Sequence, residues 1–306
     1  ISPEMIQPTN VMPDDFESFW NYAKSDLERI PVDAQVERRD DPEHPESERY
    51  HVSLANIDGT RYYCWLRIPK GDGPFPAVLL VPGAGVGAIG SQPSYAAAGF
   101  ISLSVEIHGI GIDKADEYYK ELKAGKLKQY YHFGKNDPYT FYYKRVILGA
   151  LRGLDYLCSR PDVDTSRVAV AGSSQGGALS LIVGGLDKRI KALTANVPAM
   201  CDHTGTLYGR PSGWPRLFRD GDRDKILNTS GYYDAALMSG LIDVPALLAV
   251  GFVDPTCAPT SVYAAFNNLK GYKEIDNFPD MDHDYGPGWK EKSIQWLMDA
   301  LNGKFD

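Results

Sequence analysis

Short apolar runs alternate with longer amphipathic segments along most of this chain. Continuous apolar runs closed by Pro or Gly, such as FPAVLLVPGAG (75–85), are typical of strands that are buried on both faces. Such runs predict strands at 75–85, 100–107, 167–172, 190–199, 244–251 and 273–278. Apolar residues at helical spacing predict helices at 12–30, 139–160, 175–186, 260–269 and 287–302. The chain is therefore expected to alternate strands with helices.

Two alternating stretches between residues 50 and 69 flank Asp58-Gly59, a dipeptide that favours the tight turn of a β-hairpin. The later rhythm predicts an α/β fold, with a mostly parallel central sheet, helices on both faces and the hairpin as an N-terminal antiparallel edge. We expect a single domain over 1–306, because the chain has no repeats, low-complexity tracts or evident linker. Segments near 112–138 and 200–230 break the rhythm, and we expect them to be irregular insertions that form lids or interfaces.

The charge and cysteine content narrow the class of protein. The net charge of −8 argues against a nucleic-acid partner, because phosphate contacts need clustered Lys and Arg. No apolar run approaches the roughly 20 residues that a membrane span needs. Four scattered cysteines predict neither a disulfide framework nor a CxxC metal site. The first residue is Ile1 rather than Met, which is consistent with removal of a signal peptide or an upstream segment. The composition leaves the compartment open, and a secreted or periplasmic location is only slightly favoured over a cytoplasmic one.

The segment GSSQG (172–176) matches the G-x-S-x-G pattern where a predicted strand meets a predicted helix. In a nucleophile elbow, glycines allow a sharp turn that holds the serine hydroxyl above the sheet. The helix N-terminus then offers N–H groups to a developing oxyanion. We therefore predict Ser174 as the nucleophile, with the Gln175 main-chain N–H and one N–H from the turn at 82–87 as the oxyanion hole. The alternative is a glycine-rich turn with an incidental serine.

A nucleophilic serine needs a base. The order Ser, acid, His along the chain favours His283, which lies between the last predicted strand and the last helix. His108 follows a strand end but precedes the serine. His132 and His203 fall in the insertions, where an exposed or capping role is expected. The two remaining histidines precede the main sheet and are not favoured: His44 and His51.

The acid is expected to follow a strand between the serine and the histidine. Asp254 comes just after the apolar strand at 244–251, at the carboxyl edge where sites of α/β sheets gather. Four other aspartates are rivals: Asp222, Asp224, Asp282 and Asp284. The last two adjoin the histidine in the chain, which hinders them from reaching its ring. Asp254 is the predicted acid.

With these residues placed, the sequence resembles the acetyl xylan esterase and cephalosporin C deacetylase family (carbohydrate esterase family 7) of the α/β-hydrolase fold. The likeness covers nearly the whole chain and rests on DDFESFW, DPYTFYYKRVILGALRGLDYL, AGSSQGG, ANVPAMC, VGFVDPTCAPTSVYAAFNNL and the late histidine. The glutamine in GxSQG is more specific than GxSxG alone. By position, the resemblance implies Ser174 as nucleophile, Asp254 as acid and His283 as base.

Three positions depart from the family's pattern. Its RGQ motif reads His108-Gly109-Ile110 here, its late His-Glu pair reads His283-Asp284, and a tyrosine of its oxyanion hole aligns with Ala84. The resemblance thus implies an intact triad beside an altered acyl pocket and oxyanion hole, with His108 and Trp214 as candidate pocket residues.

We expect a serine esterase that removes short acyl groups, chiefly acetyl, from carbohydrate esters such as acetylated xylan or xylo-oligosaccharides. Without an HExxH motif or clustered His and Asp ligands, neither a metal nor a cofactor is expected. Two alternatives stay open: a catalytically weak carbohydrate-binding relative, or a hydrolase of another ester, a lactone or a peptide. Aromatic residues of the insertions are expected to roof a small acyl pocket or to pack a homo-oligomer interface: Tyr130, Tyr131, Phe133 and Trp214.

Overall fold

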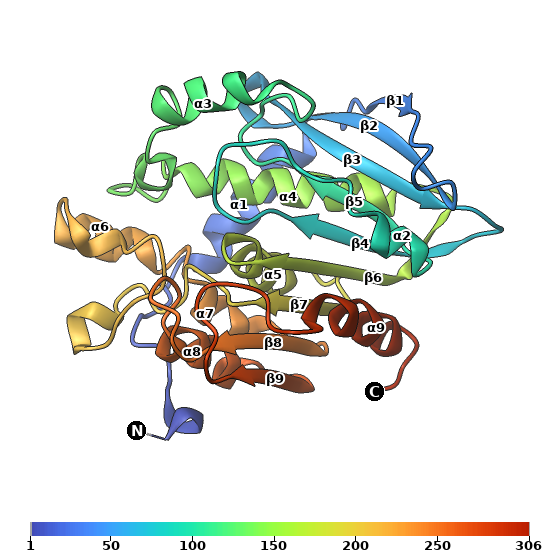
Figure 1. The fold of residues 1–306 in the computed structure, drawn as a ribbon. Coiled ribbons are helices and arrows are strands. Elements are labelled where there is room, and N and C mark those ends of the chain that lie inside the picture. The colour runs from blue at the N-terminus through green and yellow to red at the C-terminus, as the bar shows by residue number, and fades with distance from the viewer. Residues whose placement is uncertain (1, 306) are drawn as a thin grey trace.

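The computed structural model describes residues 2–305, and within this range nine strands form one twisted sheet (Figure 1). The strands are β1 (Gln35–Arg39), β2 (Ser47–Ala55), β3 (Arg61–Pro69), β4 (Phe75–Val81), β5 (Ile101–Val105), β6 (Val163–Ser173), β7 (Ala192–Asn196), β8 (Ala246–Gly251) and β9 (Lys273–Phe278). Their order in the sheet is β1-β2-β3-β5-β4-β6-β7-β8-β9. All pairings from β5 to β9 along this order are parallel, whereas β1, β2, β3 and β5 pair antiparallel. The predicted mostly parallel sheet with an antiparallel N-terminal part is confirmed.

Helices cover both faces of this sheet. They are α1 (Phe16–Glu28), α2 (Pro93–Ala97), α3 (Asp116–Ala124), α4 (Tyr142–Cys158), α5 (Gln175–Leu186), α6 (Arg223–Ser230), α7 (Ala235–Met238), α8 (Pro259–Asn268) and α9 (Trp289–Leu301). Leu79 and Val81 of β4 point into the larger core, which α1, α4, α5, α7 and α8 complete. Val78 and Leu80 of the same strand point into a smaller core closed by α9. Alternate side chains of a buried strand thus reach two different cores, which explains its continuous apolar sequence.

Two features of the fold differ from the sequence-based expectation. The strand β1 lies outside the predicted hairpin and forms the edge of the sheet, but its residues are nearly all exposed, so it carries no apolar alternation. The insertions are not irregular throughout, because α3 lies in the first and α6 in the second. In α3 only Tyr119 is buried, so the apolar signal of a core helix is missing.

The carboxyl ends of the parallel strands bring six loops to one edge of the sheet. These loops follow β4, β5, β6, β7, β8 and β9, which are neighbours in the sheet although they are spread from residue 75 to residue 278. Loops at this edge are where α/β sheets bind ligands. The cavity and the candidate site described below are built from these loops.

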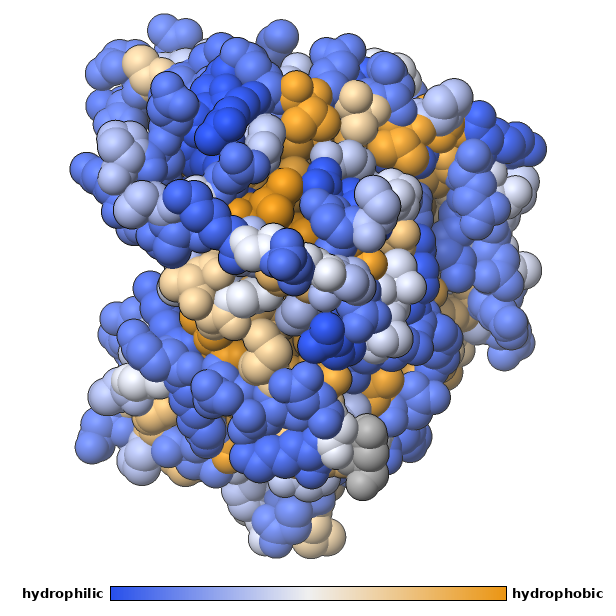
Figure 2. Space-filling view, turned by 90° about the vertical axis from the view of Figure 1, so that its right-hand side faces the viewer, coloured by the Kyte–Doolittle hydropathy of each residue, from blue (hydrophilic) through white to orange (hydrophobic). Residues whose placement is uncertain are grey.

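One side of the surface is drawn in Figure 2. Hydrophilic residues predominate on this face, and hydrophobic residues show there in separate, recessed spots (Figure 2). The face drawn therefore offers no single broad apolar area. Among residues 2–305, none of the helices combines the length and the apolar character needed to cross a membrane.

Candidate active site

Ser174 occupies the sharp turn between β6 and α5. Its main chain has φ 58° and ψ −118°, a region that L-residues rarely adopt. The turn is held because the Ser174 N–H donates to the Asn196 carbonyl oxygen at 2.9 Å. The flanking glycines are needed for space: a Cβ at Gly172 would clash with the main chain of Gly176, and one at Gly176 would clash with the Val81 carbonyl oxygen. The predicted elbow is thus present in the structure.

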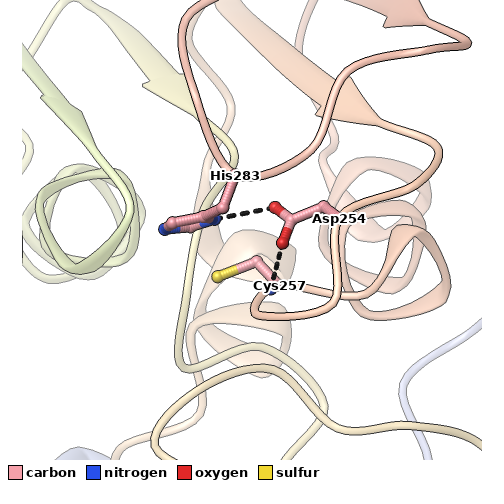
Figure 3. A group of neighbouring side chains, drawn as sticks. All are labelled: Asp254, Cys257 and His283. Carbon is pink, nitrogen blue, oxygen red and sulfur yellow. Dashed lines mark hydrogen bonds and ion pairs between the residues drawn. The ribbon is translucent and has the colours of Figure 1, made fainter.

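His283 joins Ser174 to Asp254. Its Nε2 lies 2.7 Å from Ser174 Oγ, and its Nδ1 lies 2.7 Å from Asp254 Oδ2. The second carboxylate oxygen of Asp254 accepts the main-chain N–H groups of Thr256 at 2.7 Å and Cys257 at 2.9 Å. Figure 3 shows the Asp254 carboxylate between His283 and Cys257. The Asp254 side chain is fully buried, whereas His283 is about a quarter exposed. These bonds fix both the position of the carboxylate and the plane of the imidazole.

None of the rival aspartates reaches the imidazole. Asp222 caps α6 by accepting the Lys225 N–H, and Asp224 lies exposed in the first turn of that helix. Asp284 accepts the N–H of Tyr285 at 2.7 Å. Asp282 makes no side-chain hydrogen bond among residues 2–305. The geometry therefore brings together the three residues chosen from the sequence order.

Among residues 2–305, four of the remaining histidines make no hydrogen bond to Ser174 or Asp254, and the expectation for one of them was wrong. His203 was expected to be exposed or to act as a cap, but it is fully buried. The segment around it packs against the start of α7, where the Asp234 carboxylate accepts the main-chain N–H groups of Asp202 and His203 at 2.8 Å each. His132 is partly buried, with Nε2 3.1 Å from the Pro215 carbonyl oxygen. His44 and His51 lie near and on β2, outside the site.

The two groups proposed for the oxyanion hole lie at the start of α5 and in the turn after β4. For residues 2–305, the main-chain N–H groups of Gln175 and Ala84 donate to no protein acceptor. The buried Gln175 side chain ties the two segments together, since its Nε2 donates to the carbonyl oxygens of Pro82 and Gly83 at 3.3 Å each. Its Oε1 accepts the hydroxyls of Tyr130 and Tyr143 at 2.7 Å each.

His108 holds the same turn from the other side. Its Nε2 lies 2.7 Å from the Gly85 carbonyl oxygen and must therefore carry the proton, which leaves Nδ1 to accept the Tyr142 hydroxyl at 2.8 Å. Burial lowers the pKa of His108 to about 4, in agreement with this neutral tautomer. Beneath it, the carboxyl group of Glu106 accepts the main-chain N–H groups of Gly109 at 2.7 Å and Ile110 at 3.1 Å. Burial raises the pKa of Glu106 to about 7 despite these donors.

A cavity of about 780 Å³ opens over Ser174 and His283. Ala84, His108 and Trp214 lie in its wall, as do Glu106 and Lys123, which the sequence analysis did not select. Of the four aromatic residues expected to roof the acyl pocket, only Trp214 lines this cavity. Tyr130 is buried and donates its hydroxyl to Gln175 instead. The sequence did not indicate this role, because Tyr130 stands in a run of aromatic residues without a signal of its own.

The donors beside the histidine resemble a metal site but are engaged otherwise. Asp254, Cys257 and His283 present ligand atoms within 4.8 Å of one another. However, the carboxylate already accepts three hydrogen bonds, and burial raises the pKa of the Cys257 thiol, which keeps it protonated and a poor metal ligand. The donor set therefore fits a hydrogen-bonded triad better than a metal ion. A second group, Asp41, Glu43 and His44, is only partly buried, and its Asp41 pairs with Arg67.

Comparison with known proteins assigns the family. The family model described as acetyl xylan esterase (AXE1) matches residues 4–300. The chain is 35% identical over 291 residues to the acetyl esterase Axe7A of Xylanibacter ruminicola, an alignment that covers 92% of this chain and 66% of that protein. The chain thus spans about two thirds of the length of this curated relative.

Solved structures agree in fold. An acetyl xylan esterase from Paenibacillus sp. R4 superposes with a TM-score of 0.85 at 30% identity, covering 97% of this chain and 98% of that one. Acetyl xylan esterase 1 from Thermoanaerobacterium sp. JW/SL YS485 superposes with a TM-score of 0.79 at 23% identity, covering 97% of each chain. The observed sheet and its covering helices are those of the α/β-hydrolase fold.

Proposed function

We propose that this chain, which belongs to the acetyl xylan esterase family, is a serine esterase that removes acetyl groups from carbohydrate esters such as acetylated xylo-oligosaccharides. The observation that carries the proposal is the pair of 2.7 Å contacts from His283 to Ser174 and Asp254, beside the cavity that Ser174 and His283 line. A cavity of about 780 Å³ has the size of a small-ligand site. The single domain predicted from the sequence stays part of this proposal.

In the proposed first step, His283 Nε2 takes the proton of Ser174 Oγ as that oxygen attacks the ester carbonyl carbon. The Asp254 carboxylate accepts the Nδ1–H, so the ring has the tautomer that leaves Nε2 free as a base, and it stabilises the imidazolium that forms. The sugar hydroxyl leaves with the proton from His283, and the acetyl group stays on Ser174. Water, deprotonated by the same histidine, then attacks the acetyl carbon and releases acetate.

The Gln175 and Ala84 main-chain N–H groups are proposed to bind the carbonyl oxygen as it becomes negative. Because the proposed donor of the exposed Ala84 is its main-chain N–H, the turn needs a firm anchor, and Gln175 and His108 supply it. Each such donor is worth roughly 3 to 4 kcal/mol in transition-state stabilisation. This anchored turn favours a working esterase over a catalytically weak binding protein.

The test is acetate release from acetylated xylo-oligosaccharides and from an aryl acetate by the parent and by Ser174→Ala. We expect the variant to keep its fold and to lose nearly all hydrolysis of both substrates, since the partly buried Ser174 already lines an open cavity and removing its hydroxyl leaves no void in the core. Ser173→Ala is the matched control, because the neighbouring hydroxyl accepts only the Asn196 amide at 2.8 Å. Residual activity within about tenfold of the parent in Ser174→Ala would contradict the assignment.

The substrate class is tested by comparing hydrolysis rates for esters of increasing acyl length, a lactone and a peptide. Acetyl esters should be preferred over butyryl and longer esters, as the family membership suggests. A profile that peaks at octanoate, or faster turnover of a lactone or a peptide, would contradict the deacetylase proposal and leave the fold assignment intact.

A further inference from the structure

Next to the cavity over Ser174 lies a second cavity of about 360 Å³, which we call the side cavity. It is lined by Gln129, Tyr131, His132, Trp214, Pro215, Arg216, Arg219, Asp220 and Thr256. Trp214 and Thr256 line both cavities, so the two spaces adjoin at these residues. The volume is sufficient for one sugar residue.

The shared wall is bonded to the triad. The Trp214 N–H donates to the Thr256 carbonyl oxygen at 3.0 Å, and the Thr256 N–H donates to Asp254 Oδ1 at 2.7 Å. Arg216 also donates from its guanidinium to the Pro255 carbonyl oxygen. A group held in the side cavity would therefore lie at a fixed distance from the acyl group at Ser174.

The charges of the side cavity do not cancel. The one carboxylate in its wall, Asp220, is already paired with Lys135 at 2.5 Å, and this lysine lowers the pKa of the carboxyl group. Neither Arg216 nor Arg219 forms an ion pair among residues 2–305. The side cavity therefore presents two uncompensated guanidinium groups in a chain whose net charge is −8.

The aromatic and imidazole groups suit a sugar ring. Tyr131 and Trp214 lie with their ring centroids 4.8 Å apart, so an aromatic pair forms part of a wall that is otherwise mostly polar. His132 Nε2 faces the Pro215 carbonyl oxygen, and burial lowers the pKa of the ring, so its Nδ1 carries no proton and accepts hydrogen bonds. Planar guanidinium groups pair with carboxylates through two parallel hydrogen bonds.

We propose that the side cavity binds a uronosyl residue, a sugar that carries a carboxylate, when it is attached to the carbohydrate whose acetyl ester lies at Ser174. This inference rests on the proposed function, because it names the class of carbohydrate that the esterase prefers. Arg219 supplies most of the discrimination, since its guanidinium has no other partner among the described residues, whereas Arg216 also supports the Pro255 carbonyl.

The first experiment compares kcat/KM for acetylated xylotetraose with and without one uronosyl branch. The parent should favour the uronosyl substrate by about fivefold at low salt, and about 0.5 M NaCl should remove most of the preference. Arg219→Gln should abolish the preference while leaving aryl acetate hydrolysis unchanged. Arg223→Gln is the matched control, because this exposed arginine of α6 lies outside the side cavity. Equal values for both substrates in the parent, or an unchanged preference in Arg219→Gln, would overturn the inference.

A second experiment needs no turnover. Calorimetric titration with the two unacetylated xylotetraoses should show tighter binding of the uronosyl compound by the parent and by Arg223→Gln, but not by Arg219→Gln. Equal affinities in the parent would overturn the inference by themselves. If the parent did not hydrolyse the aryl acetate, the proposed esterase function itself would be contradicted.

Discussion

Replacement of Asp254 by Asn should slow acylation by about 10⁴-fold because the main chain dictates how the new amide must point. Asp254 Oδ1 accepts the N–H groups of Thr256 and Cys257, at 2.7 Å and 2.9 Å, while Oδ2 faces His283 Nδ1 at 2.7 Å. In the variant, the amide oxygen keeps the two main-chain donors, so the amide NH₂ faces the imidazole. The ring must then hold its proton on Nε2, where it cannot accept the proton of Ser174.

The size of this effect follows from the tautomer and not from a loss of structure. A 10⁴-fold loss corresponds to about 5.4 kcal/mol of transition-state free energy, at about 1.36 kcal/mol for each factor of ten. The buried side chain keeps its volume and its two main-chain hydrogen bonds. We therefore expect the free energy of unfolding to change by only about 1 kcal/mol.

The assay is the acylation burst with an aryl acetate, with circular dichroism as the check on folding. The same change at four other aspartates serves as the control and should cost less than about tenfold: Asp222, Asp224, Asp282 and Asp284. If Asp254→Asn keeps most of its activity while one of the controls loses it, the acid has been misassigned. A folded Asp254→Asn with normal acylation would refute the tautomer argument itself.

Three further changes probe the elbow and the oxyanion turn. Gly176→Ala should lower the free energy of unfolding in urea by about 3 kcal/mol, since the new Cβ meets a main-chain carbonyl of β4. Gly87→Ala is the control, because open space surrounds this position, and it should cost about 0.5 kcal/mol at most. Equal losses in the two variants would contradict the packing argument. Tyr130→Phe removes the hydroxyl that donates to Gln175 Oε1 and accepts the Gly85 N–H of the oxyanion turn. We expect kcat to fall about tenfold with little change in KM. An unchanged kcat would contradict a positioning role for Tyr130. Because the pKa of His108 is about 4 in the fold against an ordinary 6.5, the unfolded state binds more protons at this residue between these values, and its contribution to the free energy of unfolding should fall by about 3 kcal/mol as the pH drops from 6.5 to 4. Glu106, whose pKa is raised to about 7, contributes with the opposite sign over this range, so the measurement is the difference between the pH–stability curves of the parent and His108→Gln. Two curves of the same shape would contradict the assignment of a buried neutral ring.

Local signals in the sequence were sufficient for most of the fold. Apolar runs and helical spacing predicted β4 to β9 and the long helices, because the buried faces of these elements impose a regular period on their side chains. The elbow at Ser174 was also evident, since its turn needs glycine at specific positions. The strand β1 and the helix α3 were missed because they are mostly exposed and carry no such period.

The environment of each site residue was decided by the tertiary structure. The order of residues selected Ser174, Asp254 and His283, but the 2.7 Å contacts between them depend on how strands far apart in the chain meet at one edge. His203 is buried and Tyr130 holds the Gln175 amide because distant segments pack around them, and nothing in their neighbouring residues encodes this. Periodicity reports which face of an element is buried, whereas the partner of a polar side chain is determined only when the chain has folded.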